Sequence, residues 1–503
     1  MIDRLMIAER DRARFREILA IATRFGLGLL LVRLGIGKDQ ADPAADGQSL
    51  PRRARLAMEE LGPTFVKLGQ ILATRSDLLP PEWIAELEHL QSSAPTLPFD
   101  ALRPQVEQAL GQRVEDSFAH FDPEPLAAAS MAQVHRATLH DEREVVLKIR
   151  RPGIRPQMEA DLRLIAQLAG TVEKASAEAR RFAPKALMQQ LAGAVLEELD
   201  FTSEGRNADM LRADFAGQPQ LVIPEIHWAL SSESLLVMDY IAGIPPRDPA
   251  VLQAAGIDPQ AIAAISADAM LDMVLINGRF HADPHPGNLL CLPGNRVALL
   301  DLGMIGHVSP RRQSEFMAFV QSLTQQDTAL LADILAQWST GSGVSRGRVD
   351  AAAERLIARH GKGPLVLSAM VGDFMQLMRE EGMTMPPDLL LVFKALITVD
   401  GVMTTIAPGF DLTTAMRRSS RKLIAARINP AHWAPLLQSV AWEISRAGDD
   451  APRLIRAALR RLEQDSQPPS TSSESEAIRT AGLLIAGSVL IGAVLIAGTI
   501  AWG

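Results

Sequence analysis

Hydrophobic positions in the first quarter of the chain recur with the spacing of helices. Residues 52–73 show this period, and a second short helix is expected after Pro80, because proline is favoured in the first turn of a helix. Residues 18–36 are apolar but interrupted by two arginines. They predict an amphipathic helix that lies either on a membrane surface or against the protein core. The pattern therefore predicts a helical region over residues 1–115.

The pattern changes to strand-like alternation further along the chain. Residues 131–139 and 144–150 are short alternating runs joined by a charged turn, which indicates a β-hairpin. A helical stretch over 185–210 follows, and then come strand candidates at 221–226 and 234–240.

Residues from 258 to about 462 are mostly helical in pattern. The exceptions are a loop over 281–290 and a short apolar run over 297–300. We therefore divide the chain into an N-terminal helical extension (1–115), a strand-rich lobe (116–241), a helical lobe (242–462), a linker (463–480) and a terminal apolar helix (481–502).

The terminal apolar segment has the length of a membrane span. Residues 481–502 carry no charged side chain, and as a helix they would be roughly 33 Å long, enough to cross a hydrocarbon core of about 30 Å. We predict a single C-terminal transmembrane helix, with a buried helix of a soluble domain as the alternative. Arginines just before it predict that the soluble part faces the cytoplasm. Small residues four apart would allow pairing into a homodimer.

The composition narrows the classes of function. The chain is 47% hydrophobic and 22% charged, as in ordinary globular proteins. A net charge of −8 argues against a nucleic-acid partner, because such proteins normally present a basic face. The single cysteine, Cys291, excludes an intramolecular disulfide and a zinc site built from cysteines.

Four polar residues occur in an order that suits phosphoryl transfer. Lys148 lies on an apolar strand, where an inward-pointing lysine needs an anionic partner; a solvent-facing lysine on an edge strand is the alternative. Asp283 and Asn288 keep the Asp-x-x-x-x-Asn spacing of a kinase catalytic loop, and Asp301 begins an Asp-Leu-Gly sequence. Lys148 would then bind the phosphates of ATP and Asp283 would be the catalytic base. Asn288 and Asp301 would bind Mg²⁺.

Two histidines flank the expected catalytic base. The spacing of His281 and His285 around Asp283 would also allow a transition-metal site, but a third ligand is missing from the pattern. Because His281 matches the structural histidine of a kinase loop, we predict a structural role for it.

The chain departs from a typical protein kinase in two places. The glycine-rich loop expected before the lysine strand is replaced by Ala127, Ala128, Ala129 and Ser130. Alanine adopts positive φ only at a cost, so this turn must approach the phosphates of a nucleotide differently. The glycine-rich run at 341–347 follows a helix and is interpreted as a plain loop. An Ala-Pro-Glu segment, part of the cradle for a peptide substrate, does not follow Asp301.

Taken together, these features resemble the UbiB family of atypical kinase-like proteins, which is linked to ubiquinone biosynthesis. The resemblance covers nearly the whole chain and implies an α+β, atypical protein-kinase-like bilobal fold. The motifs that carry it are Lys67-Leu68-Gly69-Gln70, the alanine-rich run 127–130, Glu198-Leu199-Asp200 followed by Glu204, the loop 283–288 and Asp301-Leu302-Gly303.

The resemblance also implies roles for single residues. Lys67 and Gln70 would lie on an extension that folds over the pocket where kinases admit protein substrates. From the residues alone, a solvated helix lysine is the favoured interpretation of Lys67. Glu198 and Asp200 would face Lys67, and Glu204 would pair with Lys148. Met238 to Ile241 would form the hinge that meets the adenine, and residues 127–130 would cover the nucleotide.

Cofactors and partners follow from the same resemblance. ATP and Mg²⁺ are expected, and so are polyprenylated quinone precursors or membrane lipid, other ubiquinone biosynthesis proteins, and a bacterial inner membrane. Family members usually have two terminal spans, whereas this chain shows one. We expect a slow ATPase that helps polyprenylated intermediates leave the bilayer. The alternatives are a genuine protein or small-molecule kinase and a non-catalytic lipid-binding scaffold.

Overall fold

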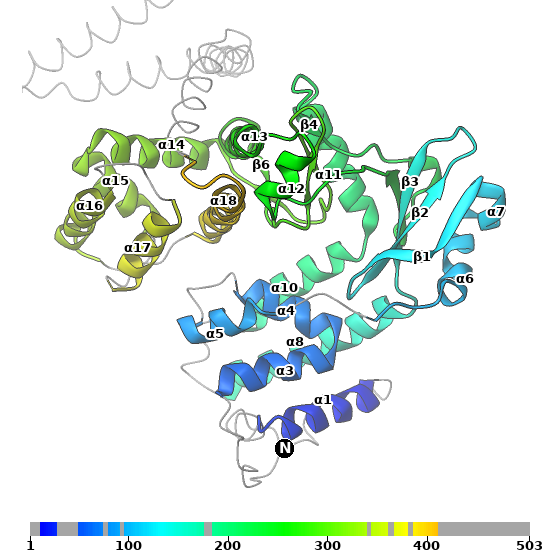
Figure 1. Cartoon of the computed structure of the whole chain (residues 1–503). Coiled ribbons are helices and arrows are strands. Elements are labelled where there is room, and N and C mark those ends of the chain that lie inside the picture. Colours follow the sequence, from blue (N-terminus) through cyan, green and yellow to red (C-terminus); the bar gives the residue numbers. More distant parts are fainter. Residues whose placement is uncertain are drawn as a thin grey trace, which may run out of the picture. The chain divides into compact units, whose positions relative to one another are not determined.

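The computed structural model describes residues 11–27, 49–73, 79–90, 95–175, 184–339, 344–360, 367–380 and 386–410 (Figure 1). All of them lie in the first of the two units into which the chain divides, Met1–Leu423. The predicted linker and terminal span, and the end of the predicted helical lobe, lie outside the described residues.

The N-terminal extension consists of short helices. They are α1 (Arg12–Arg24), α3 (Leu50–Leu61), α4 (Pro63–Ala73) and α5 (Pro81–Leu87). The helical pattern over 52–73 is confirmed, but it forms two helices that are separated at Gly62. Gly62 adopts φ of +99°, a left-handed conformation open to glycine, and Pro63 starts α4 without needing an amide hydrogen bond.

The amphipathic stretch near the N-terminus faces the protein over its described part. Phe15, Ile18 and Ile21 of α1 are buried with Leu61 of α3 and Leu164 of α8 (Ile154–Ala175). This packing agrees with the core-facing alternative for α1. Residues 28–36 of the predicted helix lie outside the described residues.

An antiparallel sheet carries the lysine strand. Its order is β1 (His120–Ala128), β2 (Ala132–Thr138), β3 (Glu144–Arg150) and β5 (Leu235–Asp239). The predicted hairpin is confirmed by the pairing of β2 with β3, from Ala132 opposite Arg150 to Thr138 opposite Glu144. The sequence pattern did not indicate β1, because its register shifts around Pro125 and much of it is exposed.

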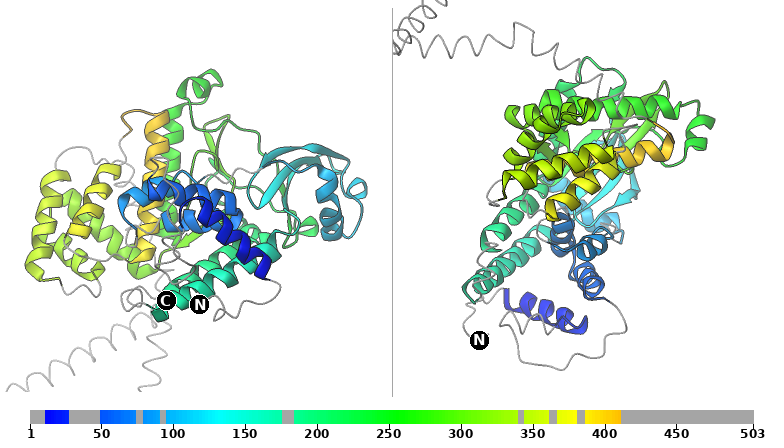
Figure 2. Two further views of the ribbon diagram at one scale, coloured as in Figure 1. Left: turned by 90° about the horizontal axis from the view of Figure 1, so that it is seen from below. Right: turned by 90° about the vertical axis from the view of Figure 1, so that its left-hand side faces the viewer.

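Helices cover this sheet and link it to the next lobe. Two short helices, α6 (Phe99–Leu110) and α7 (Val114–Ser117), bury apolar side chains against the sheet. The helical stretch predicted over 185–210 is confirmed, with a break between α10 (Pro184–Glu198) and α11 (Phe201–Asp214). In Figures 1 and 2, the blue α3 and α4 lie beside α8 and α10, and α4 contacts both.

The second lobe is mainly helical, with short strands around its loops. The strands are β4 (Leu221–Val222), β6 (Arg279–His281), β7 (Leu289–Leu292), β8 (Arg296–Leu299) and β9 (Ile305–His307). They form a sheet of order β4-β8-β7 and a separate β6-β9 pair. The helical pattern predicted from residue 258 missed β6, β7 and β9, which are only three or four residues long.

The helices of this lobe surround one apolar core. They are α12 (Pro249–Ala254), α13 (Pro259–Asp272) with the π-helical turn Met273–Asn277, α14 (Pro310–Gln325), α15 (Thr328–Trp338), α16 (Arg346–His360), α17 (Leu367–Glu380) and α18 (Pro387–Ile406). The short η3 (Trp228–Leu230) instead contacts β5 of the strand-rich lobe. A cluster of aromatic rings links α14, α15, α17 and α18, made by Phe316, Phe319, Trp338, Phe374 and Phe393.

Within the described residues, two helical segments are long and apolar enough to cross a membrane. They are Pro259–Asn277 and Asp388–Ile406, and 61% of each apolar window is buried inside the protein. Because both contribute to the core of the helical lobe, their apolar character is explained by packing.

Candidate functional site

Lys148 points into the protein from the middle of the sheet. Its strand β3 pairs with β2 on one side and with β5 on the other, so the edge-strand alternative does not apply. The Nζ atom lies 2.9 and 2.8 Å from the two carboxylate oxygens of Glu204 on α11, and 3.4 Å from Oδ1 of Asp301. The structure therefore brings Lys148 together with Glu204 and with the Asp-Leu-Gly sequence.

Lys148, Glu204 and Asp301 alter one another's pKa values. Burial alone would lower the pKa of Lys148, but the negative charges of Asp301 and Glu204 outweigh it and raise the pKa. The charge of Lys148 in turn lowers the pKa of Asp301. Burial, together with the charge of Asp301, raises the pKa of Glu204 to about 7 although Lys148 opposes the shift. Lys148 is therefore charged at neutral pH.

The predicted catalytic loop lies between β6 and β7 and is closed by its own hydrogen bonds. The His285 amide donates to the Asp283 carbonyl over 2.9 Å, and the Asn288 amide donates to the His285 carbonyl over 2.9 Å. Nδ2 of Asn288 donates to the Asp283 carbonyl over 3.1 Å, so its side-chain oxygen is not needed for this contact. The Leu300 amide donates to the Asn288 carbonyl and holds the loop beside the strand that leads to Asp301.

Asp301 follows β8 and is half exposed. Its Oδ1 accepts a hydrogen bond of 3.1 Å from the Gly303 amide. The Asn207 side chain on α11 donates to the Leu302 carbonyl over 3.0 Å and joins this turn to the helix that carries Glu204. The Asp-Leu-Gly turn and α11 thus form one supported unit.

The donor set fits Mg²⁺ better than a transition metal. Among the described residues, no group of three or more His, Cys, Asp or Glu side chains gathers around a possible metal position. Mg²⁺ needs only one or two protein oxygens because water and substrate phosphates complete its shell. His281 is buried, which lowers its pKa to about 4, and its Nδ1 accepts a hydrogen bond from the Asp283 amide. These contacts agree with a structural histidine.

The Lys67 motif lies on α4 and reaches α10. Nζ of Lys67 is 2.6 Å from Oε1 of Glu198, so Lys67 has a carboxylate partner and is not simply solvated. The expected pairing with Asp200 is not seen: its carboxylate accepts hydrogen bonds from the backbone and hydroxyl of Thr202 at the start of α11. Asp200 is the N-cap residue of α11, and its carboxylate accepts a hydrogen bond from a backbone amide that has no partner within the helix. This explains why Asp200 does not pair with Lys67.

The other residues of the motif hold α4 against α5. Nε2 of Gln70 donates to the Leu90 carbonyl over 3.1 Å. A side chain at Gly69 would meet the side chains of Leu90 and Met58, so the motif needs glycine for close packing.

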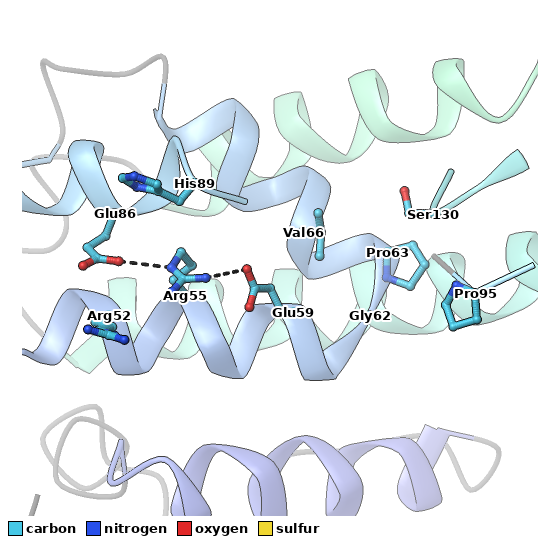
Figure 3. Close-up of a pocket in the computed structure, with 10 residues that line it drawn as sticks. All are labelled: Arg52, Arg55, Glu59, Gly62, Pro63, Val66, Glu86, His89, Pro95 and Ser130. Atoms are coloured by element: carbon cyan, nitrogen blue, oxygen red, sulfur yellow. Dashed lines mark hydrogen bonds and ion pairs between the residues drawn. The ribbon is translucent and has the colours of Figure 1, made fainter. Parts of the chain in front are cut away.

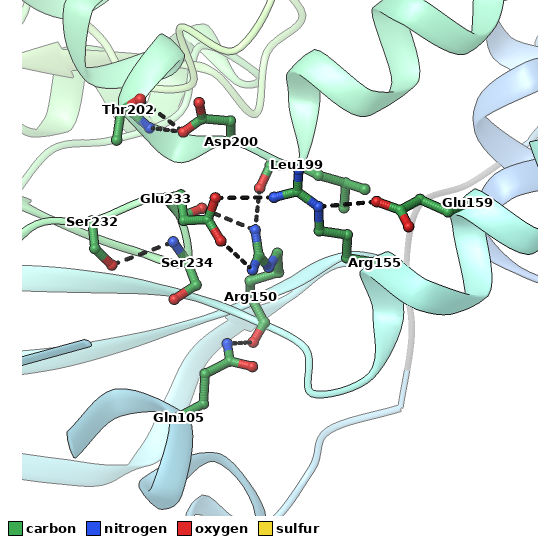
Figure 4. Close-up of polar contacts among 10 residues, drawn as sticks. All are labelled: Gln105, Arg150, Arg155, Glu159, Leu199, Asp200, Thr202, Ser232, Glu233 and Ser234. Atoms are coloured by element: carbon green, nitrogen blue, oxygen red, sulfur yellow. Dashed lines mark hydrogen bonds and ion pairs between the residues drawn. The ribbon is translucent and has the colours of Figure 1, made fainter. Parts of the chain in front are cut away.

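A buried arginine holds the junction between α10 and α11 (Figure 4). Arg150, at the end of β3, donates from Nη1 to the carbonyls of Leu199 over 2.7 Å and Glu233 over 3.2 Å. Arg155 adds a contact of 3.0 Å to the Glu233 carboxylate. The strand that carries Lys148 is thus attached to the segment between Glu198 and Glu204.

The alanine-rich run is only partly a turn. Ala127 and Ala128 are the last residues of β1, paired with Val134 and Gln133, so the predicted turn is shorter than expected. Ala129 closes it with a hydrogen bond of 2.8 Å from its amide to the Ala132 carbonyl. None of these alanines adopts positive φ, as the residue type predicts.

Ser130 belongs to a pocket on the extension side of this turn (Figure 3). The pocket has a volume of about 820 Å³, and within it Arg55 binds Glu59 over 2.6 Å and Glu86 over 3.0 Å. The remaining lining residues are Arg52, Gly62, Pro63, Val66, His89 and Pro95.

The expected hinge runs from the sheet to the catalytic-loop hairpin. Met238 is paired with Val146 on β3, and Ile241 lies just beyond the end of β5. Ile244 then exchanges two backbone hydrogen bonds with Cys291 on β7. The adenine-binding role of Met238 and Ile241 stays a prediction.

One residue of the site was missed by the sequence reasoning. Lys394 on α18 lies with its Nζ atom 3.7 Å from Oδ1 of Asp283. The sequence signal that could have identified it is a single lysine within the apolar run Leu389 to Ile397, where a charged side chain is costly unless it has an anionic partner.

A lysine–glutamate pair on a sheet and helix, an Asp/Asn loop and a following Asp-Leu-Gly turn define a kinase-like nucleotide site. Residues 89–335 match the family described as "ABC1 atypical kinase-like domain", and residues 364–411 match the family described as "UbiB helical domain". The chain belongs to the UbiB family of atypical kinase-like proteins, and the resemblance inferred from the sequence is confirmed.

Individual relatives agree with this assignment. A protein named Probable protein kinase UbiB from Xylella fastidiosa (strain M12) is 34% identical over 423 residues, covering 82% of this chain and 76% of its own length. One of the same name from Xanthomonas campestris pv. campestris (strain B100) is 35% identical over 468 residues, covering 90% and 83%.

A solved structure shares the fold. The Rv3197–erythromycin complex from Mycobacterium tuberculosis superposes with a TM-score of 0.53 at 22% identity, covering 71% of this chain and 92% of that one. Together with the family match over residues 89–335, this confirms the predicted kinase-like fold of mixed helix and sheet.

Proposed function

We propose that this protein binds Mg-ATP at the Lys148 site and hydrolyses it slowly in support of ubiquinone biosynthesis at a membrane. The observation that carries the proposal is the position of Lys148 between Glu204 and Asp301, with the Asp283 loop at the end of the adjoining strands. Such an arrangement suits a triphosphate, since catalysis of phosphoryl transfer consists mainly of positioning and of charge stabilisation.

The residues divide the work as follows. Lys148, charged at neutral pH, binds the inner phosphates of the nucleotide. Asn288 and Asp301 would hold Mg²⁺, which neutralises phosphate charge when it is bound. Asp283, whose carboxylate is exposed to solvent, accepts the proton of the attacking group.

Water is the phosphate acceptor that we favour. Lys67 joins α4 to α10 through Glu198, which keeps the N-terminal extension close to the nucleotide site. Its charge also contributes to the lowered pKa of Asp301. An extension held so close, in a chain without an Ala-Pro-Glu segment, leaves little room for a peptide substrate.

The second candidate is a genuine kinase. The name Probable protein kinase UbiB carried by its relatives favours it, and so does the Asp283 loop, which suits a hydroxyl acceptor as well as water. Labelled phosphate on a purified protein partner or small molecule, lost in Asp283→Asn, would establish this candidate.

The membrane part of the proposal rests on the sequence. Residues 481–502 would form the span, in a bacterial inner membrane, with the nucleotide site on the cytoplasmic side. The ligands would be polyprenylated quinone precursors or membrane lipid, handled together with other ubiquinone biosynthesis proteins. Pairing of the spans would give a homodimer.

The test uses the full-length protein in lipid nanodiscs. We expect Mg-dependent binding of ATP and slow phosphate release that rises with anionic lipid or a phenolic lipid mimic. Asp301→Asn should reduce turnover at least about tenfold, because it removes a metal ligand. Asp333→Asn, on an exposed ion pair with Arg346, is the matched control and should leave turnover unchanged.

Cells supply the second half of the test. A deletion strain carrying Asp301→Asn should accumulate less quinone than one carrying the wild type. The proposal would be refuted if the wild-type protein failed to bind nucleotide and the Asp301→Asn strain produced quinone at the full level. Unchanged quinone levels in Lys148, Asp283 and Asp301 variants would instead favour a lipid-binding scaffold.

A further inference from the structure

The helical region that follows the kinase-like domain contributes a cation to the site. Lys394 lies on α18, and its Nζ atom is 3.7 Å from Oδ1 of Asp283. The side chain of Lys394 is 38% exposed and that of Asp283 is 43% exposed, so both groups face solvent at the mouth of the site. The distance exceeds that of a hydrogen bond, which leaves the ammonium donors free to turn toward another anion.

The catalytic loop itself carries no lysine or arginine. Its sequence from residue 281 to 288 is His-Ala-Asp-Pro-His-Pro-Gly-Asn. Burial lowers the pKa of His281 to about 4, so its ring is neutral at pH 7. Nδ1 of His285 accepts a hydrogen bond from the Gly287 amide and is engaged in the turn. Within the described part of the chain, Lys394 is therefore the cation that accompanies Asp283.

The helix holds Lys394 in place. Asp388 in the first turn of α18 binds Arg312 on α14 over 3.1 Å. Phe393, next to Lys394, is buried in the aromatic cluster, with Phe316 and Trp338 around it. Because the neighbouring positions are packed, the backbone at Lys394 has little freedom, and only the flexible side chain can move toward a ligand.

A phosphate is the ligand that this position suits. A catalytic base must lie within hydrogen-bond reach of the attacking group, which approaches the terminal phosphate of the nucleotide. A cation beside Asp283 is therefore adjacent to that phosphate, whereas Lys148 serves the inner phosphates on the sheet side. The negative charge of Asp283 would otherwise repel the terminal phosphate, and a nearby ammonium offsets this repulsion.

We propose that Lys394 binds the terminal phosphate of the nucleotide, so that the site distinguishes a triphosphate from a diphosphate through a residue of the helical region. This inference rests on the proposed binding of Mg-ATP. If Lys394 only supported the fold, its loss would affect ATP and ADP equally, because both nucleotides share the inner phosphates.

The experiment compares Mg-ATP with Mg-ADP on the same full-length protein. Dissociation constants for both are measured by calorimetry for the wild type, Lys394→Met and Lys394→Arg. Lys174→Met, which changes an exposed lysine in the last turn of α8, is the matched control. Thermal unfolding of each variant establishes that the fold is retained.

We expect Lys394→Met to weaken Mg-ATP binding about tenfold or more, the value of a charged hydrogen bond, and to change Mg-ADP binding less than about twofold. Lys394→Arg should restore most of the ATP affinity, and Lys174→Met should match the wild type. Equal weakening for both nucleotides, or no change for either, would overturn the inference while leaving the proposed function intact. A wild-type protein that binds neither nucleotide would overturn the proposed function and the inference with it.

Discussion

Two lysine–glutamate pairs lie on either side of the α10–α11 junction, and they differ in burial. Glu204 binds Lys148 of the sheet with both oxygens, and the two side chains are 6% and 17% exposed. Glu198 binds Lys67 of the N-terminal extension through one contact, and these side chains are 26% and 18% exposed. Breaking the inner pair leaves a buried charge, whereas breaking the outer pair exposes its glutamate to nearby water.

The inner pair is therefore a buried contact, whereas the glutamate of the outer pair is reached by solvent. The inner pair joins an inner strand of the sheet to α11, and its burial makes it costly to break. The outer pair joins a separate helical extension to α10, and its modest energy is that of a partly exposed ion pair. Both depend on one short segment, whose Leu199 carbonyl is held by Arg150.

Removal of the inner lysine should have the largest effect on stability. Lys148→Met should lower the free energy of unfolding by about 3–5 kcal/mol, because it removes the charged partner of the buried Glu204 side chain. Adding Glu204→Gln should recover most of this loss without restoring nucleotide binding. Denaturant titrations and ATP binding measure the two effects. A single variant as stable as the wild type would remove the difference between the pairs.

The buried His281 should make the stability of the protein depend on pH. His281 has a pKa near 4 in the folded protein because it is buried, against about 6.5 when unfolded. As pH falls from 6.5 to 4 the unfolded chain takes up a proton that the folded chain does not, so stability is lost by about 3 kcal/mol. His281→Gln should show a correspondingly shallower loss in unfolding curves across this range. Equal slopes for both proteins would contradict a buried, neutral histidine.

Substitutions at the α10–α11 junction should lower the free energy of unfolding by a smaller amount. Arg150→Met should cost about 2 kcal/mol, because the buried Leu199 carbonyl loses its charged donor. Arg155→Met is the control: it removes a more exposed contact to the same Glu233 and should cost less than about 1 kcal/mol. Equal costs in denaturant titrations would show that the junction does not depend on Arg150.

The outer pair should have the smallest effect. Lys67→Met should change the free energy of unfolding by less than about 1 kcal/mol. A double-mutant cycle with Glu198→Gln measures the pair by itself. A coupling energy above about 2 kcal/mol would mean that the outer pair is as firmly held as the inner one, which would contradict the difference between the two pairs.

The sequence by itself determined the chemistry of the site. Lys148, Asp283, Asn288 and Asp301 were recognised because each lies at the end of a short apolar run or at a fixed spacing within a loop. The hairpin that carries Lys148 was also predictable, since alternation and a charged turn are local properties. The helix breaks at Gly62 and at residues 199–200 were missed, because helical periodicity continues across a single interruption.

Only the tertiary structure decided which charges meet. Glu198, Asp200 and Glu204 are close in sequence, yet one binds Lys67, one caps α11 and one binds Lys148. The position of Lys394 beside Asp283 likewise depends on how α18 packs in the helical lobe. Local patterns specify the type of a residue and its element, but an ion pair between distant segments is set by the packing of apolar faces, which the local pattern does not encode.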